Sequence, residues 1–170
     1  MRGVEPELQP FWDARAAGNF IGGGTGTGLL FFATLASGSV DAYRIQALLA
    51  LAFIGAGLTC VWLEIGRPLR AINVFFHPQT SWMTREGIVA VPLFLTALAA
   101  VWMGGGVFVG MAALLGVGFL YCQGRILKAA RGIPAWRDAR MPALIVACSL
   151  AEGTGLFWLL AGWWAGTPTL

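Results

Sequence analysis

One polar stretch divides the chain: Glu64-Ile-Gly-Arg-Pro-Leu-Arg-Ala-Ile-Asn-Val-Phe-Phe-His-Pro-Gln-Thr-Ser-Trp-Met-Thr-Arg-Glu-Gly87. It is the longest run that mixes acidic, basic, imidazole and aromatic side chains, and the sequence on both sides of it is apolar. Pro68 and Pro78 each remove a backbone donor and push the preceding residue out of helical geometry. We therefore expect a bent, re-entrant or surface-lying segment between two membrane-spanning helices, and we interpret it as the working face of an integral membrane protein.

The composition outside this stretch is typical of a membrane protein. Of the 170 residues, 58% are hydrophobic and 11% are charged, and the mean hydropathy is +0.74. Soluble domains carry roughly 25% charged residues. The net charge of +3 does not indicate a nucleic-acid partner, because the basic residues flank apolar segments and form no soluble basic face. We expect a single all-α integral membrane domain in a lipid bilayer.

Five apolar segments are each close to the roughly 20 residues with which a helix crosses a bilayer. We expect transmembrane helices at about 19–37, 45–65, 87–103, 107–126 and 141–164. The first contains Gly22-Gly-Gly-Thr-Gly-Thr-Gly28, which resembles a nucleotide-binding loop but lacks the lysine of a Walker motif and a preceding strand. Gly22 with Gly26, and Gly24 with Gly28, have small-xxx-small spacing and predict close helix packing.

The basic residues predict the orientation of these spans. If five spans alternate, every Lys and Arg except Arg44 lies on one side, in the N-terminal tail, the central stretch and the loop after the fourth span. By the positive-inside rule this side is cytoplasmic, which predicts a cytoplasmic N-terminus and an external C-terminus. Glu5, Glu7 and Asp13 precede the first apolar segment, so we expect no secretory signal.

The thiols and the imidazole give no pattern of a metal site. Cys60, Cys122 and Cys148 lie singly in apolar segments, without the paired spacing that binds zinc or an iron–sulfur cluster, and we expect inert buried thiols. His77 is the single histidine of the chain, whereas a membrane cytochrome b usually needs two axial histidines per haem. We expect no haem and no metal ion in this chain.

Two motifs indicate a family. The run Glu64–Asn73, followed by Ser81-Trp-Met-Thr-Arg-Glu-Gly-Ile88, resembles the loop between the second and third spans of the haem-free anchor subunits of dimethyl sulfoxide reductase and polysulfide reductase. The run Ala129-Ala-Arg-Gly-Ile-Pro-Ala-Trp136 resembles their loop after the fourth span, and the Gly-rich first span is similar too. Family members typically have more spans than this chain. The first four, which form the quinone-binding bundle of the family, are the ones retained.

The resemblance implies a membrane subunit of an oxidoreductase complex, distinct from the subunit that converts the substrate. It implies binding of a quinone or quinol (menaquinone or ubiquinone) and electron exchange with an iron–sulfur subunit. That subunit in turn serves a molybdenum or tungsten bis-pterin catalytic subunit at a prokaryotic cytoplasmic membrane. Two departures stand out: many members have histidine where this chain has Glu64, and a family tyrosine near the end of span four aligns with Cys122, beside Tyr121.

Quinone chemistry suggests roles for the polar residues. Two protons accompany two electrons, so the site needs a hydrogen-bond donor and a titratable group. We expect Glu64 or Glu86 to exchange the proton. The expected quinone site consists of Glu64, Arg67, His77, Trp82, Arg85, Glu86 and Tyr121. The alternative is that these residues cap helix ends: Glu86 stands where a first-turn acid is favoured, and Arg67 or Arg70 pairs with it.

The loop arginines also have two interpretations. Guanidinium groups suit carboxylates of a docked soluble subunit, but basic residues at these places also follow from topology alone. We assign topology to Arg125 and Lys128. We assign docking to Arg67, Arg70, Arg85 and Arg131.

Glu152 is an isolated anomaly near the middle of the fifth span. A carboxylate there costs roughly 2.5–3.5 kcal/mol on insertion scales, so we expect it to be protonated, paired or facing a polar cavity. Gly153 and Gly155 permit close approach of another helix. The sequence leaves open whether Glu152 belongs to a proton path or only forms a hydrogen bond within the bundle.

Three functions are compatible with these features. The first is a quinone-reactive anchor subunit, and the second is a purely structural anchor for the catalytic and iron–sulfur subunits. The third is a small transporter or channel, which suits Glu152 but gives no reason for the arginines and carboxylates of the central stretch.

Overall fold

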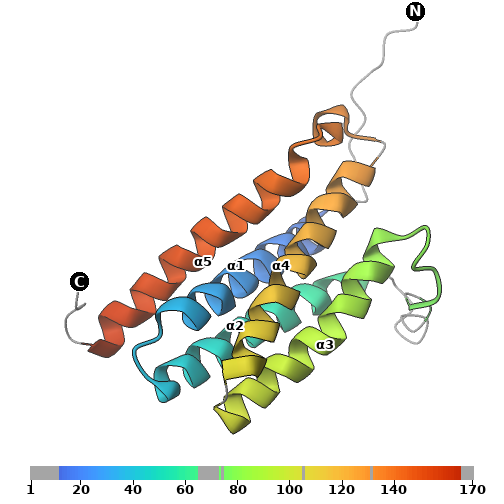
Figure 1. The fold of residues 1–170 in the computed structure, drawn as a ribbon. Helices are drawn as coiled ribbons and strands as arrows, with labels where there is room; N and C mark the ends of the chain where they lie inside the picture. The colour runs from blue at the N-terminus through green and yellow to red at the C-terminus, as the bar shows by residue number, and fades with distance from the viewer. Residues whose placement is uncertain (1–11, 65–72, 74, 105, 131, 166–170) are drawn as a thin grey trace, which may run out of the picture.

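A computed structural model describes residues 12–64, 73, 75–104, 106–130 and 132–165, with the backbone alone for Glu64 and residues 163–165. These residues include five α-helices and the short 3-10 helix η2, and the described part of the chain contains no β-strand. The helices are α1 (Ala14–Ala36), α2 (Val40–Glu64), α3 (Trp82–Met103), α4 (Gly106–Ala129), η2 (Pro134–Arg137) and α5 (Met141–Ala165) (Figure 1). The expected all-α fold is therefore confirmed.

Four of the helices, α2 to α5, are long and apolar enough to cross a membrane, which makes this a multi-pass membrane protein. Helix α1 has 23 residues, about 34 Å at 1.5 Å per residue, so its length also suffices. Its glycines and polar side chains make it less apolar than the other four. The first span, expected at about 19–37, thus stays a prediction.

Helix α1 begins at Ala14 and not near Asn19, because Asp13 caps it. The Asp13 carboxylate accepts hydrogen bonds from the backbone amides of Arg15 (2.8 Å) and Ala16 (3.4 Å), which have no partner inside the helix. The Arg15 guanidinium also donates to this carboxylate at 2.8 Å, and these bonds to Arg15 lower the pKa of Asp13 below its ordinary value of 3.8. The polar first turn therefore extends the helix beyond its apolar part.

Helix α3 is capped at both ends. The Ser81 hydroxyl accepts from the backbone amide of Thr84 at 3.3 Å, so the helix begins at Trp82 and not at Gly87. Gly104 ends it with φ +64, in the left-handed region where glycine has no steric penalty, and its amide donates to Ala100 at 2.9 Å.

Helix α1 lies in the middle of the bundle, packed most extensively against α2 and α5 and also against α4 (Figure 1). One glycine pair faces α2. A Cβ atom at Gly22 would lie 2.8 Å from the backbone oxygen of Phe53, and one at Gly26 would lie 2.6 Å from that of Ala50. The predicted small-xxx-small contact is confirmed for this pair, since only glycine leaves room for the α2 backbone.

The second glycine pair of α1 faces α5. A Cβ atom at Gly24 would lie 2.7 Å from the Ser149 hydroxyl, and one at Gly28 would collide with the backbone of Ser149 and Gly153. The predicted role of Gly153 in close approach is confirmed by the same contact. Gly155 differs: a Cβ atom there would meet nothing within 4 Å, so its expected packing role is wrong within this chain.

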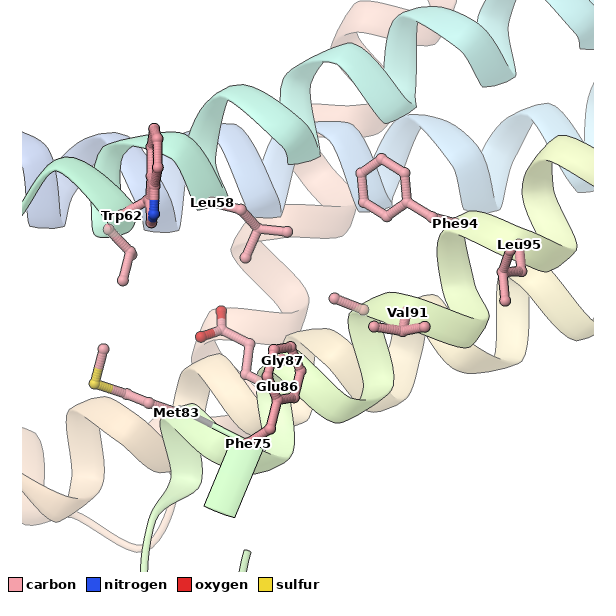
Figure 2. A pocket seen from close by; sticks show the side chains of 11 residues that line it. Leu58, Trp62, Phe75, Met83, Glu86, Gly87, Val91, Phe94 and Leu95 are labelled. Atoms are coloured by element: carbon pink, nitrogen blue, oxygen red, sulfur yellow. The ribbon is translucent and has the colours of Figure 1, made fainter. Parts of the chain in front are cut away.

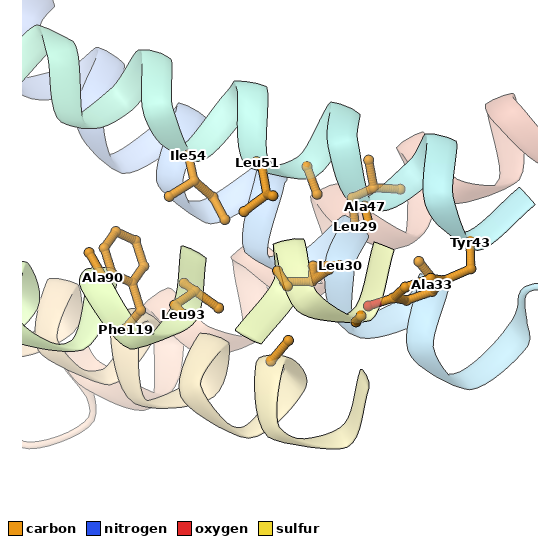
Figure 3. Packing of buried hydrophobic residues seen from close by; sticks show 14 of the residues in the cluster. Leu29, Leu30, Ala33, Tyr43, Ala47, Leu51, Ile54, Ala90, Leu93 and Phe119 are labelled. Atoms are coloured by element: carbon orange, nitrogen blue, oxygen red, sulfur yellow. The ribbon is translucent and has the colours of Figure 1, made fainter. Parts of the chain in front are cut away.

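The apolar core fills the space between α1, α2, α3 and α4 (Figure 3). Leu29, Leu30, Ile54, Leu93 and Phe119 are all fully buried there. Helix α3 packs mainly on α4 and touches α2 only slightly. This uneven packing leaves room between α2 and α3.

One end of the bundle, here called the basic end, holds the starts of α1, α3 and α5, the ends of α2 and α4, and η2 (Figure 1). The Trp12 and Trp136 rings lie 4.6 Å apart, and Arg15 donates to the backbone oxygen of Leu63 at 3.3 Å. The described basic residues at this end are Arg15, Arg85, Arg125, Lys128, Arg137 and Arg140. Arg44 lies at the opposite end, where it pairs with Asp41.

Burial of the cysteines agrees only partly with expectation. Cys122 is buried and Cys60 is half-buried, but Cys148 is exposed on α5. The prediction of three buried thiols is wrong for Cys148, because only one side of α5 packs on the rest of the bundle.

Candidate functional site

Glu86 is the one acidic or basic side chain that is buried among the residues that the structure describes; it is 3% exposed. It lies on α3 beyond the first turn, which contains no acidic residue. The interpretation of Glu86 as a helix-end acid is therefore wrong, because the Ser81 cap starts α3 early enough to carry Glu86 into the bundle. A carboxyl group at such a place needs polar partners.

Two amide side chains supply those partners. Asn19 of α1 donates to a Glu86 carboxyl oxygen at 3.5 Å, and the side-chain amide of Gln123 of α4 lies beside the same carboxyl group. Gln123 is fully buried and donates to the backbone oxygen of Asn19 at 3.2 Å. It fits there because a Cβ atom on Gly23 would collide with its amide. Three helices thus meet at Glu86.

The two amides keep unused acceptors. Within the described part of the chain, Asn19 Oδ1 and Gln123 Oε1 are buried without a hydrogen-bond partner. Buried polar atoms in native proteins almost always have a partner in protein, water or ligand. The arrangement therefore suits a group that brings hydrogen-bond donors to Glu86. Neither Asn19 nor Gln123 was predicted as a site residue, although polar amides inside apolar segments indicate contacts between helices.

A cavity of about 450 Å³ lies between α2 and α3 and has Glu86 in its wall (Figure 2). The remaining lining is almost wholly apolar, with Leu58 and Trp62 on α2 and Val91 and Phe94 on α3. Figure 2 shows the Glu86 carboxyl group pointing into the space between these two helices. Apolar cavities of roughly 300–1,000 Å³ with few polar groups are typical ligand sites.

A smaller cavity of about 230 Å³ reaches Glu86 from the side of α1. Trp12, Asn19 and Phe20 contribute to its wall, and it shares Val61, Met83 and Glu86 with the larger cavity. Glu86 thus borders two cavities.

The larger cavity reaches the outer surface of the bundle. At its rim Trp62 is 45% exposed, Val91 49% and Leu95 63%. These residues belong to helices that are apolar enough to face lipid. An apolar ligand from a bilayer therefore has a route to Glu86 that avoids water.

Two aromatic residues predicted for the quinone site, Trp82 and Tyr121, lie in a separate cluster at the basic end. Trp82 and Tyr121 meet edge to face at 5.9 Å, and the guanidinium carbons of Arg85 and Arg125 lie 4.1 Å and 4.2 Å from the centre of the Trp82 ring. Arg125 also donates to the Tyr121 hydroxyl at 2.7 Å. Such cation–π contacts tie α3 to α4. Tyr121 lines a different cavity from the two that Glu86 borders.

Arg85 and His77 shape the turn that precedes α3. Arg85 donates to the backbone oxygens of Pro78 (2.7 Å) and Gln79 (3.0 Å), so its guanidinium holds the turn closed. The backbone oxygen of His77 accepts from the amide of Ser81 at 3.0 Å, and the His77 side chain is exposed. Neither side chain lines the cavities that Glu86 borders.

Several predicted site residues lie outside the described residues. Glu64 ends α2, but its side chain is not among those described. The expectations for Arg67, Arg70 and Arg131 also fall on such residues. The bent segment expected around Pro68 falls there as well.

Glu152 does form a hydrogen bond within the bundle. Thr25 of α1 donates to its carboxyl oxygen at 2.7 Å, while the Glu152 side chain stays exposed on α5. This confirms the hydrogen-bonding alternative and leaves a proton path untested. Over the described residues, no group of three His, Cys, Asp or Glu side chains is placed to hold a metal ion.

The chain matches no protein-family model, no curated protein and no solved structure.

Proposed function

We propose that this chain is a quinone- or quinol-reactive membrane subunit that exchanges electrons with an iron–sulfur partner. That partner serves a molybdenum or tungsten bis-pterin subunit. The observation that carries the proposal is a buried carboxyl group, Glu86, where two apolar cavities meet and one of them reaches the lipid-facing surface. A lipid-dissolved carrier that gains or loses protons needs an apolar binding space with a titratable group beside it, and this site offers both.

The residues around Glu86 have separate tasks in this proposal. Glu86 gives or takes the proton that accompanies electron transfer. Asn19 orients the Glu86 carboxyl group and offers its own free acceptor to a quinol hydroxyl. Leu58, Trp62 and Phe94 enclose the apolar part of the carrier and keep water out.

Assignment of the protein partners rests on the basic end and on the family resemblance. In this proposal α1 is a fifth span and the basic end faces the cytoplasm of a prokaryotic cell. Exposed Arg137 and Arg140 offer positive charge to an acidic docking surface. Arg85 contributes less to docking than expected from the sequence, because its guanidinium already binds two loop carbonyls.

The first test is binding of short-chain menaquinone and ubiquinone analogues to the full chain in lipid nanodiscs. Quinones quench tryptophan fluorescence, and Trp62 lies in the cavity wall. We expect saturable quenching, lost on Val91→Phe, which narrows the cavity. Leu98→Phe is the matched control, because Leu98 is similarly exposed on α3 but does not line the cavity. Absence of saturable quenching in the wild type would instead support the purely structural anchor.

The second test concerns the proton. In the complex purified with its partners, Glu86→Gln should keep quinone binding within a few-fold and lower quinone turnover on the order of 100-fold, the usual contribution of a positioned acid or base. Glu152→Gln makes the same chemical change on α5, away from both cavities, and should leave turnover unchanged. Equal turnover in the Glu86→Gln and wild-type complexes would refute the proton role.

A further inference from the structure

A third cavity, of about 510 Å³, lies between α4 and α5 at the basic end. It has no residue in common with the two cavities at Glu86. Its wall consists of Tyr121, Arg125, Lys128, Ala139, Pro142, Ala143, Val146, Ala147 and Leu150.

The charge in this wall is all positive. Arg125 and Lys128 stand three residues apart on α4, so their side chains lie on the same face of the helix, with Lys128 in its last turn. The wall contains no carboxylate. Both ion pairs found among the described residues involve other arginines, Arg15 and Arg44. The positive charge of this wall therefore suits an anionic group.

The α5 side of the cavity is apolar and runs into the bundle. Pro142, Ala143, Val146, Ala147 and Leu150 recur at helical spacing and so share one face of α5. From Pro142 to Leu150 this face extends about 12 Å at 1.5 Å per residue. The cavity therefore has a cationic end at the membrane boundary and an apolar wall that continues to greater depth.

We propose that this cavity binds an anionic phospholipid. Its phosphate contacts Arg125 and Lys128, Tyr121 contributes a hydroxyl near the head group, and an acyl chain lies along α5. Basic pockets between transmembrane helices at the cytoplasmic surface suit such head groups. A free phosphate ion makes no use of the apolar wall, and a quinone ring carries no charge that matches two cations. The proposal is independent of the function assigned to Glu86.

The test compares two lipids that differ only in head group. The full chain is purified, exchanged into detergent with equal amounts of phosphatidylglycerol and phosphatidylcholine of the same acyl chains, and analysed by native mass spectrometry. Each basic residue near an anionic surface contributes about fivefold, so we expect preferential retention of phosphatidylglycerol on the order of thirtyfold. Inorganic phosphate at millimolar concentration should not displace it.

Variants of the basic residues distinguish lipid binding in this cavity from nonspecific attraction of anionic lipid by the positive charge of the basic end. Lys128→Gln keeps Arg125 stacked on Trp82 and should lower the preference about fivefold. Arg125→Gln combined with Lys128→Gln should abolish it. The matched control is Arg137→Gln with Arg140→Gln, which removes the same charge from exposed residues at the same end and should retain the preference.

Three results would overturn the proposal. The first is equal retention of the two lipids by the wild type. The second is a loss of preference in the Arg137→Gln, Arg140→Gln control that equals the loss in the Arg125→Gln, Lys128→Gln variant. The third is displacement of phosphatidylglycerol by phosphate alone. Lys128 also stabilises the C-terminal end of α4 through the helix dipole. If that were its only role, Lys128→Gln would reduce thermal stability equally in both lipids and leave the head-group preference intact.

Discussion

Two carboxyl groups inside the apolar helices differ in what surrounds them. Glu86 is enclosed by amides from two other helices and borders both cavities. Glu152 is exposed on α5 and has the Thr25 hydroxyl as hydrogen-bond donor. The surroundings of Glu86 allow it to meet a ligand, whereas those of Glu152 favour a structural bond between α1 and α5.

We predict measurable coupling between Thr25 and Glu152. Thr25→Val and Glu152→Leu each remove the 2.7 Å hydrogen bond, so their effects on the free energy of unfolding should not add. Hydrogen bonds between transmembrane helices average about 0.6 kcal/mol, with a maximum of about 1.7 kcal/mol, which sets the coupling energy expected from a double-mutant cycle. Unfolding in mixed detergent micelles gives the four free energies.

Glu152→Gln is the control for this cycle, because the glutamine side-chain oxygen still accepts from Thr25. It should leave the free energy of unfolding within about 0.5 kcal/mol of the wild type, as for substitutions that keep their contacts. Additive effects of Thr25→Val and Glu152→Leu would show that the bond contributes nothing to stability.

Among the helices, α1 has the surface that lets other helices pack closely on two of its sides. Its glycines lie against the backbone of α2 on one side and of α5 on the other. In a bilayer no hydrophobic force draws apolar helices together, so close van der Waals contact between backbones has to hold them. Glycine removes the side chains that would keep the backbones apart, which explains why the least apolar helix lies at the centre.

We predict that two Gly→Ala substitutions differ in their effect on stability. Gly28→Ala should lower the free energy of unfolding by about 1–3 kcal/mol, the usual cost of overpacking, because the new methyl group meets backbone atoms of Ser149 and Gly153. Gly110→Ala on α4 has nothing within 4 Å. It should be neutral or stabilise by up to about 1 kcal/mol through helix propensity. Equal stability of the two variants would argue against close packing of α1 on α5.

At the scale of the whole molecule, the number of spans decides on which sides the termini lie. Helices α2 to α5 give four crossings, and α1 would add a fifth. Contacts at the basic end join the start of α1 to the end of α2 and to η2, and the start of α3 to the end of α4, as alternating spans require.

We predict five crossings, with the two termini on opposite sides. In sealed vesicles, an impermeant thiol reagent should label Gly3→Cys from the side that labels Gln79→Cys, and Thr169→Cys from the side that labels Ser39→Cys. Cys148 is replaced by alanine in this background, because its thiol is exposed. Labelling of positions 3 and 169 from the same side would exclude α1 as a span.

Sequence alone predicts the helical class, the approximate positions of the helices, the packing glycines of α1 and the gathering of basic residues at one end. These features depend on local hydropathy and spacing, which each segment carries within itself. The helix starts were less well predicted. Asp13 and Ser81 cap α1 and α3 before their apolar parts begin, and a hydropathy pattern marks only the apolar parts.

The surroundings of Glu86, in contrast, depend on how the helices pack. Asn19, Glu86 and Gln123 come from three helices that are far apart in the chain, and their meeting depends on how each helix is rotated about its axis. The glycine contacts of α1 fix how it faces α2 and α5. The slight contact of α2 with α3 leaves the cavity beside Glu86 open. A carboxyl group in the sequence becomes a candidate site only when packing buries it beside such a cavity.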